Sequence, residues 1–286
     1  NKVATLAYTE FSAAQDFEEG EYIITITAAN DIDTVLFTSS PNLIPATSSQ
    51  TATVFDGDEN NTSSVIVNMV SNIGAERRLS DASSSPTVRF IHAAKPLVTA
   101  DIFDDEPLTN RIAAGLAHGE ATGDIDVSGE TETYYWTPAD STAAILLQGA
   151  YTAPNGTHSN IIVVGPTDEW VYYTYLPDRA SISTYPRLQF IQSALDNSLV
   201  DIYRLDADAT ITEEDSPVVR ALRTPATTSP QPLIAGSYDI FVTTAGEQTV
   251  LAGPLRIDPA DGDLINILVL DTDDPAVSEL RILADP

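Results

Sequence analysis

The sequence predicts an all-β protein built from tandem Ig-like antiparallel β-sandwich modules. The first observation is a repeat with a period of about 100 residues. The segment Val88–Ala94 recurs as Leu188–Ala194, and Asp101-Ile102-Phe103 recurs as Asp201-Ile202-Tyr203. A repeat of this length is a whole domain, because solenoid units are about 20 to 45 residues long.

The second observation is the dominance of strand-like runs. They are rich in β-branched and aromatic residues and are bracketed by turn residues; the clearest are 22–27, 64–70, 161–164, 238–242 and 264–270. Helical periodicity is poor throughout. Residues 110–118 predict at most one short helix or an irregular connection. Short strands separated by turns at this spacing are typical of antiparallel β-sandwiches.

Aligning the repeats predicts three modules: 1–79, 86–185 and 186–286, with residues 77–86 as a short linker. In the first module, Leu6-Ala7-Tyr8 aligns with Leu116-Ala117-His118, and Gly20-Glu21-Tyr22 aligns with Gly236-Ser237-Tyr238. The counterpart of Thr87–Asp105 is missing there, so we expect the first module to lack its first two strands.

A sandwich without two strands exposes apolar faces and open edges. Three explanations remain open at this point. The natural chain continues upstream, which fits a sequence that starts at Asn1 without Met; another subunit supplies the missing strands by β-strand addition; or the first half of the module is too divergent to recognise.

The charge balance excludes some partners. Lysine and arginine number 13 against 42 acidic residues, a formal net charge of −29. Nucleic acids and anionic lipid surfaces both require a basic face, so neither is expected. The acidity fits either adaptation to salty water or an ordinary soluble acidic protein. No apolar run of roughly 18 residues predicts a membrane span, and the absence of cysteine removes disulfides and thiolate chemistry.

The repeat resembles a known family. Its members open with a strand reading Val-Arg-Val-Val-His-Ala and continue as Ala-Val-Asp-Val-Tyr; here the matching segments are Val88–Ala94, Ala100–Asp105 and Val200–Tyr203. These segments are similar to the DUF four-three-nine-seven family, a domain of unknown function found as tandem repeats in exported and cell-surface proteins. The Ser-Pro-Asp-Ala-Pro loop of that family is absent from both full modules. The resemblance implies a β-sandwich and an extracellular location, and no activity.

Catalytic motifs are not evident, and we expect no enzyme. The three histidines, His92, His118 and His158, all fall in the second module, and no nucleophile elbow, Walker loop or zinc-protease motif accompanies them. Cofactors are not expected, apart from Ca²⁺ in acidic loops. Turns favour the same residues, and the candidate metal ligands are Asp56, Asp58, Asp258, Asp261 and Asp263.

Aromatic residues concentrate in the second module. The candidates are Tyr134, Trp136, Trp170, Tyr172, Tyr173 and Tyr175. Successive strand residues point to opposite faces, so some of these rings are expected at a surface. They fit cross-strand packing at a domain junction, a subunit interface or a carbohydrate platform.

Together these features predict a non-enzymatic extracellular or cell-surface structural protein. We expect it to self-associate as a filament or fibre subunit assembled by β-strand addition. The alternative is a secreted surface module that binds carbohydrate or calcium.

Overall fold

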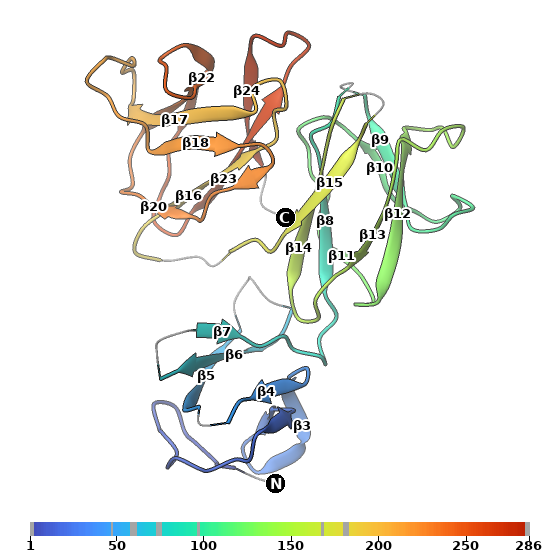
Figure 1. The fold of residues 1–286 in the computed structure, drawn as a ribbon, viewed down its shortest axis with the longest axis vertical. Helices are drawn as coiled ribbons and strands as arrows, with labels where there is room; N and C mark the ends of the chain where they lie inside the picture. Colours follow the sequence, from blue (N-terminus) through green and yellow to red (C-terminus); the bar gives the residue numbers. More distant parts are fainter. Residues whose placement is uncertain are drawn as a thin grey trace. The chain divides into compact units, whose positions relative to one another are not determined.

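The computed structural model describes residues 3–46, 48–57, 62–72, 76–95, 98–166, 169–179 and 183–283. Across this part of the chain every regular element is a β-strand, which confirms the predicted all-β class (Figure 1). The chain divides into two compact units. The N-terminal unit comprises Asn1–Thr87, Asp126–Gly129 and Ala153–His158; the larger unit comprises Val88–Ile125, Glu130–Thr152 and Ser159–Pro286.

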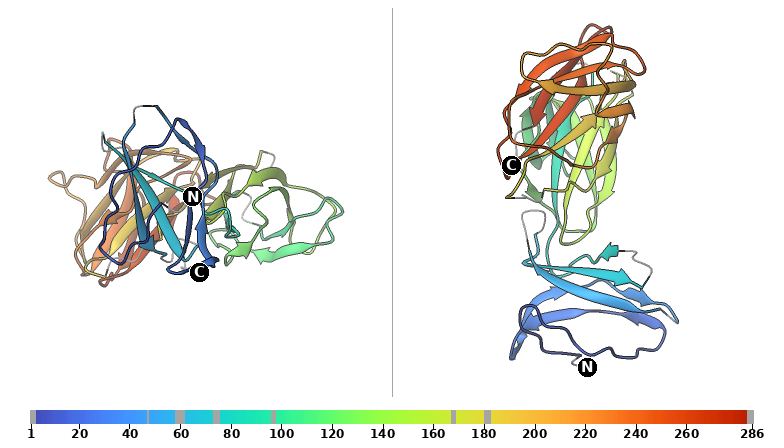
Figure 2. Two further views of the ribbon diagram at one scale, coloured as in Figure 1. Left: turned by 90° about the horizontal axis from the view of Figure 1, so that it is seen from below. Right: turned by 90° about the vertical axis from the view of Figure 1, so that its left-hand side faces the viewer.

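The N-terminal unit contains three small sheets. Two are strand pairs, β1 with β4 and β2 with β3, and the third has the order β5-β6-β7. The bounds are β1 Gly20–Tyr22, β2 Thr25–Ala28, β3 Asp31–Thr38, β4 Asn42–Ile44, β5 Gln50–Asp56, β6 Val65–Ser71 and β7 Glu76–Arg78. Residues 3–19 form no strand and run as a long connection (Figure 2).

The middle segment, residues 88–175, contributes two four-stranded sheets to the larger unit, with the orders β10-β9-β12-β13 and β11-β8-β14-β15. The bounds are β8 Thr87–His92, β9 Ala100–Phe103, β10 Arg111–Leu116, β11 Ile125–Asp126, β12 Thr131–Pro138, β13 Leu147–Thr152, β14 His158–Val164 and β15 Val171–Tyr175. The prediction of a short helix or an irregular connection at 110–118 was wrong. These residues carry β10, whose pairing with β9 is interrupted by register shifts, and this irregularity hides the two-residue period of a strand.

The C-terminal segment, residues 187–283, has the same arrangement. One sheet has the order β18-β17-β21-β22 and the other β19-β16-β23-β24, with β20 also on β16. The bounds are β16 Arg187–Gln192, β17 Leu199–Asp206, β18 Val219–Arg223, β19 Ala226–Thr227, β20 Gln231–Pro232, β21 Tyr238–Thr244, β22 Val250–Ile257, β23 Leu264–Asp271 and β24 Ser278–Leu283.

Both sheets of the C-terminal segment fill one apolar core. Phe190 of β16 and Ile267 of β23 lie in the same buried cluster as Ile202 of β17 and Ile240 of β21. In the middle segment, Phe90 of β8 contacts Trp136 of β12 edge-on, with ring centroids 5.9 Å apart. Alternate residues of each strand therefore point into a core between two facing sheets.

Strands β8 and β16 are buried on both faces, unlike a strand with one solvated face. Their second faces meet in a cluster that joins the middle and C-terminal segments. Ile91 of β8 and Ile191 of β16 occupy equivalent positions in the repeat, and both are fully buried in this cluster. Ile162 and Leu268, on the neighbouring strands β14 and β23, lie there too. The two segments thus bury the same sheet face against each other, as in an isologous interface.

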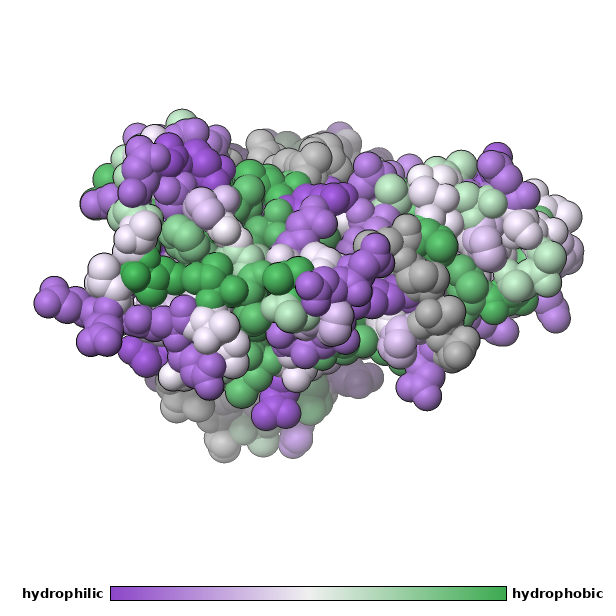
Figure 3. Space-filling view, turned by 90° about the horizontal axis from the view of Figure 1, so that it is seen from above, coloured by the Kyte–Doolittle hydropathy of each residue, from purple (hydrophilic) through white to green (hydrophobic). Residues whose placement is uncertain are grey.

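Polar contacts flank this cluster. The Lys95 Nζ lies 2.5 Å from an Asp196 carboxylate oxygen, and Arg281 donates to the His118 carbonyl at 2.6 Å. On the face seen from above, exposed apolar residues (green) lie among hydrophilic ones (purple) (Figure 3). The face-to-face packing explains why two short repeats are held in one compact unit.

Replacing Ile191 with alanine tests this packing. Removing a fully buried isoleucine side chain leaves a cavity and costs about 2–4 kcal/mol of unfolding free energy. The Ile282→Ala control changes a side chain that is 44% exposed and should cost less than about 1 kcal/mol. Urea unfolding followed by tryptophan fluorescence measures both values; equal losses would contradict the interface.

Candidate functional site

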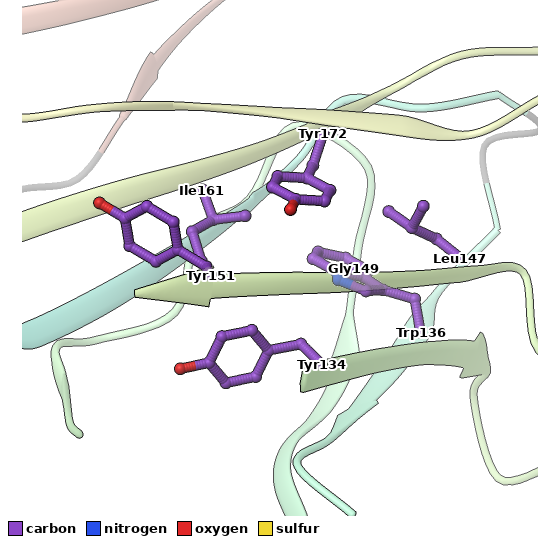
Figure 4. Close-up of a pocket in the computed structure, with 7 residues that line it drawn as sticks. All are labelled: Tyr134, Trp136, Leu147, Gly149, Tyr151, Ile161 and Tyr172. Carbon is purple, nitrogen blue, oxygen red and sulfur yellow. The ribbon is translucent and has the colours of Figure 1, made fainter. Parts of the chain in front are cut away.

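Three of the predicted aromatic residues line one pocket of the middle segment. Tyr134 and Trp136 of β12 lie beneath Tyr172 of β15 (Figure 4). The rest of the lining is Leu147, Gly149, Tyr151 and Ile161. The space between these side chains is about 200 Å³, open solvent included, so the pocket is shallow. Tyr134 and Trp136 are only 4% and 1% exposed.

The lack of a side chain at Gly149 leaves room for the Tyr172 ring. A Cβ atom at this position would come within 2.1 Å of the Tyr172 ring. The Tyr172 hydroxyl donates to the Ala150 carbonyl at 2.5 Å. Tyr172 therefore lies across edge strand β13 and covers part of the opening between the two sheets. Burial raises the pKa of Tyr134, and its hydroxyl donates to Glu132, so it stays a neutral donor.

The other three aromatic candidates lie elsewhere. Trp170 is 5% exposed and donates its indole N–H to the Lys95 carbonyl. Tyr173 and Tyr175 pack against the cluster that joins the middle and C-terminal segments, and burial raises the pKa of both hydroxyls. The candidate set is thus divided among a shallow pocket, a core position and an internal junction.

Two of the three histidines, His92 and His118, lie close together, with ring centroids 5.9 Å apart. His92 is fully buried, and its Nε2 lies 2.7 Å from the Val98 carbonyl. In the C-terminal segment the equivalent Gln192 donates to the Asn197 carbonyl at 2.8 Å. Either side chain therefore forms a hydrogen bond to the backbone of the loop that follows its strand. Burial, reinforced by the nearby His92, lowers the pKa of His118 to about 4. Burial lowers the pKa of His92 as well, so both imidazoles are neutral near pH 7.

The acidic candidates do not converge. Asp56 ends β5 opposite Val65, Asp258 accepts from the Ser237 hydroxyl, and Asp263 accepts from the Ala260 N–H. Asp261 is exposed in the turn before β23, and Asp58 lies outside the described residues. Among the residues that the structure describes, no group of three His, Cys, Asp or Glu side chains could hold a metal ion.

A repeated aspartate joins three parts of each complete segment. Asp201 of β17, 4% exposed, accepts from the Ala221 N–H at 2.7 Å and from the Gly246 N–H at 2.9 Å. Asp101 of β9 accepts equivalently from Gly115 and Asp140 at 2.7 and 3.0 Å. Each carboxylate thus connects its own strand to the next strand and to the turn of the hairpin beside it. We call this arrangement the aspartate clamp.

The N-terminal unit contains the same turn that follows β10 in the middle segment. Glu10 accepts from the Ala7 N–H at 2.9 Å, as Glu120 does from Ala117 at 3.2 Å. The residue before each glutamate has a positive φ, 68° at Thr9 and 77° at Gly119. This geometry supports the sequence alignment of the two segments.

The surroundings of the two turns differ. In the middle segment, β8 pairs with the turn through His92, which accepts from Gly119 and donates to Glu120. Leu116 and His118 are 7% and 8% exposed there, whereas the aligned Leu6 and Tyr8 are 47% and 95% exposed. Phe11, just beyond the turn, is 88% exposed. The turn is therefore covered in the middle segment, where both β8 and the C-terminal segment contact it, and the aligned side chains are exposed in the N-terminal unit.

The hairpin of the N-terminal unit also matches a complete counterpart. The Tyr22 hydroxyl donates to the Glu18 carbonyl at 2.8 Å, as the Tyr238 hydroxyl does to Ile234 at 2.9 Å. Eight residues after each tyrosine, Asn30 and Gly246 have positive φ in the hairpin turn. Strands β1 and β2 thus correspond to β21, and the following β3 and β4 correspond to β22.

The second edge of this hairpin is open. Strand β21 pairs with β22 on one edge and, over seven residue pairs, with β17 on the other. Over the described ranges, β2 pairs only with β3. Ile240 and Val242 are fully buried, but the corresponding Ile24 and Ile26 are only partly buried. We call the free edge of β1–β2, with Asn30, the open-edge site.

Strand β5 of the N-terminal unit lies beside β6, at the position that β16 has beside β23. In the C-terminal segment, β16 runs parallel to β23, and β24 lies on the other side of β23. In the N-terminal unit, β5 has the position of β16 beside β6, but it runs antiparallel. Val54 and Phe55 of β5 remain 48% and 52% exposed. Strand β5 was not among the predicted strands, although the run Thr51–Phe55 could have indicated it.

Comparisons with known proteins add little. No family model and no curated protein matches the chain, so the family resemblance stays a prediction. Among solved structures the chain is similar to the Bacillus anthracis TIE protein, with 11% identity, a TM-score of 0.22, and coverage of 78% of this chain and 48% of that one. The chain thus spans about half of that protein, and a likeness at this TM-score defines neither fold nor function. No helix in the described residues is long and apolar enough to cross a membrane.

The aspartate clamp predicts a pH-dependent stability. Burial alone would raise the pKa of Asp101, but hydrogen bonds from Gly115, Arg111 and Asp140 outweigh it and lower the pKa below 3.8. A lowered native pKa means that the stabilisation is complete above pH 3.8 and is lost as the pH falls through the native value. We expect Asp101→Asn to cost about 2 kcal/mol at pH 7 and less as the pH falls below 3.8.

Urea unfolding of both proteins between pH 7 and pH 2.5 measures this difference. The Asp261→Asn control changes an exposed carboxylate and should leave the unfolding curve nearly unchanged. A stability difference between the parent and Asp101→Asn that does not vary with pH would contradict the clamp.

Proposed function

We propose that the chain is a non-enzymatic structural protein of the extracellular or cell-surface space. In this proposal it is built from Ig-like antiparallel β-sandwich repeats, and its N-terminal repeat is completed by a β-strand from another polypeptide. Strand addition of this kind joins subunits through main-chain hydrogen bonds, while alternate side chains fill the vacant face. The product is a filament or fibre.

The observation that carries the proposal is the open edge of β1–β2. The two corresponding inner strands have partners on both edges, β9 and β13 beside β12 and β17 and β22 beside β21. An isolated two-stranded hairpin is marginal in water, and an open edge is a template for another chain. A strand at the open-edge site would restore the neighbour that this hairpin has in both complete segments.

The exposed apolar side chains support the same proposal. Tyr8 and Phe11 are almost fully exposed, although their turn is a covered element in the middle segment. The net charge of −29 keeps such a surface soluble and opposes close approach of like subunits at low salt. The extracellular location rests on the family resemblance of the repeat.

The alternative, a module that binds carbohydrate or calcium, has weaker support. Its best location for a sugar is the pocket beside Tyr172, which is small and has a largely buried floor. Among the described residues, Asp56 lies apart from the three candidates in the 258–263 connection, and no group of three acidic or histidine side chains could hold a metal ion. Strand addition accounts for more of the exposed apolar surface than either ligand does.

Assembly of the full chain tests the proposal. Sedimentation velocity and electron microscopy at about 1 M NaCl, where the Debye length is only ~3 Å, should show polymers that grow with protein concentration. Phe11→Asp should reduce the polymer fraction at least tenfold, because it places a charge on the exposed apolar turn of the N-terminal unit. Ile234→Asp, at a position 81% exposed in the C-terminal segment, is the matched control. Monomers at every concentration, or equal effects of both substitutions, would refute the proposal.

A further inference from the structure

The chemistry of the strand that fits the open-edge site follows from the two complete segments. Strands β9 and β17 carry the aspartate of the clamp between two buried residues, Ala100 and Ile102 in β9 and Val200 and Ile202 in β17. Each strand continues with an aromatic residue, Phe103 or Tyr203. Both therefore bring a carboxylate and apolar side chains to the same hairpin position.

The N-terminal unit retains the receiving half of the clamp. Gly246 donates its N–H to Asp201 from the turn between β21 and β22. Asn30 stands at the same position of the β2–β3 turn, with a φ of 66° that matches the 77° of Gly246. Within the described residues no side-chain carboxylate accepts the Asn30 N–H; the nearby Asp31 accepts from Asp33 and Thr34 instead.

We propose that the partner of the open-edge site is an extended segment with the pattern apolar–Asp–apolar–aromatic, whose aspartate accepts the Asn30 N–H. In the register of β17, the residue after this aspartate lies opposite Ile26 and the residue before it opposite Ala28, as Ile202 and Val200 lie opposite Val242 and Thr244. Both add to the apolar side chains beneath the hairpin, as Val200 and Ile202 share one core with Val242. The segment pairs antiparallel to β2, as β17 does to β21.

This inference deepens the proposed function and rests on it. The clamp also explains how a chain with many exposed carboxylates can bind a partner segment that brings a further carboxylate. The incoming aspartate is the single charge of the pattern, and the Asn30 N–H takes the place of the turn N–H of the existing clamps. There each carboxylate accepts two backbone N–H groups, one of them from the hairpin turn, and Asp101 also pairs with Arg111. A segment without that aspartate would leave the turn unbound, and a segment with a charge at a flanking position would place it in the core.

Peptide binding tests the inference with the chain's own sequence as the probe. A peptide of residues 197–207, which contains β17, is titrated into the full chain and followed by fluorescence anisotropy and hydrogen exchange. We expect saturable binding that slows exchange in β2 and at Asn30 and leaves β21 unchanged. The Asp201→Ala peptide should bind at least about tenfold more weakly, because a hydrogen bond to a charged group is lost. The Ile202→Asp peptide should not bind.

The outcomes separate the two proposals. No binding of the parent peptide, equal binding of the Asp201→Ala peptide, or protection only outside the open-edge site would overturn the inference. Free peptide could fail to bind only because its affinity is too weak. Fusing the same peptide ahead of Asn1 through a Gly/Ser linker removes this cause, since tethering raises the effective concentration of the peptide. If the chain polymerises but neither format protects β2, the inference fails and strand addition stands. If the peptide binds with the expected dependence and the chain stays monomeric, the inference stands and the filament proposal fails.

Discussion

Pairing of both edges of an inner strand is the constraint on which the rest of this structure depends. A strand exposes a row of N–H and C=O groups on each edge, and each buried group requires a hydrogen-bond partner. Strands β12 and β21 satisfy this requirement with a neighbour on each side. That pairing holds the sheets together, and the facing sheets then bury their alternate side chains. Where the neighbour is missing, at β1–β2, the side chains beneath the strand are only partly buried.

The aspartate clamp shows how an acidic chain uses charge inside its sheets. Asp101 and Asp201 are nearly inaccessible, yet each accepts two backbone N–H groups. A buried carboxylate is costly unless its oxygens are hydrogen-bonded. Because the acceptors bridge a strand and the turn of the neighbouring hairpin, the clamp couples strand pairing to hairpin geometry. Loss of the strand therefore removes both a row of pairing bonds and the carboxylate that binds the turn.

Several features could be predicted from the sequence because they depend on local patterns. The β-branched runs predicted an all-β chain, and the match of Leu6-Ala7-Tyr8 with Leu116-Ala117-His118 identified two copies of one turn. The burial of both faces of β8 and β16 could not be predicted, since it arises from packing between segments far apart in the chain. Strand β10 was missed because register shifts break its alternation. The aromatic candidates shared a composition but not a location, since strand alternation and sheet position direct them to different surroundings.

Amide hydrogen exchange of the two matching hairpins tests the central claim most directly. The hairpin β2–β3 has one paired edge on β2, whereas β21–β22 has β17 as a further neighbour on β21. For the monomeric chain at neutral pH, the account predicts that amides of residues 25–28 exchange at least about tenfold faster than those of residues 241–244, because opening a free edge breaks fewer contacts. Equal protection of the two segments in a monomer would contradict the open edge and, with it, the function proposed for this chain.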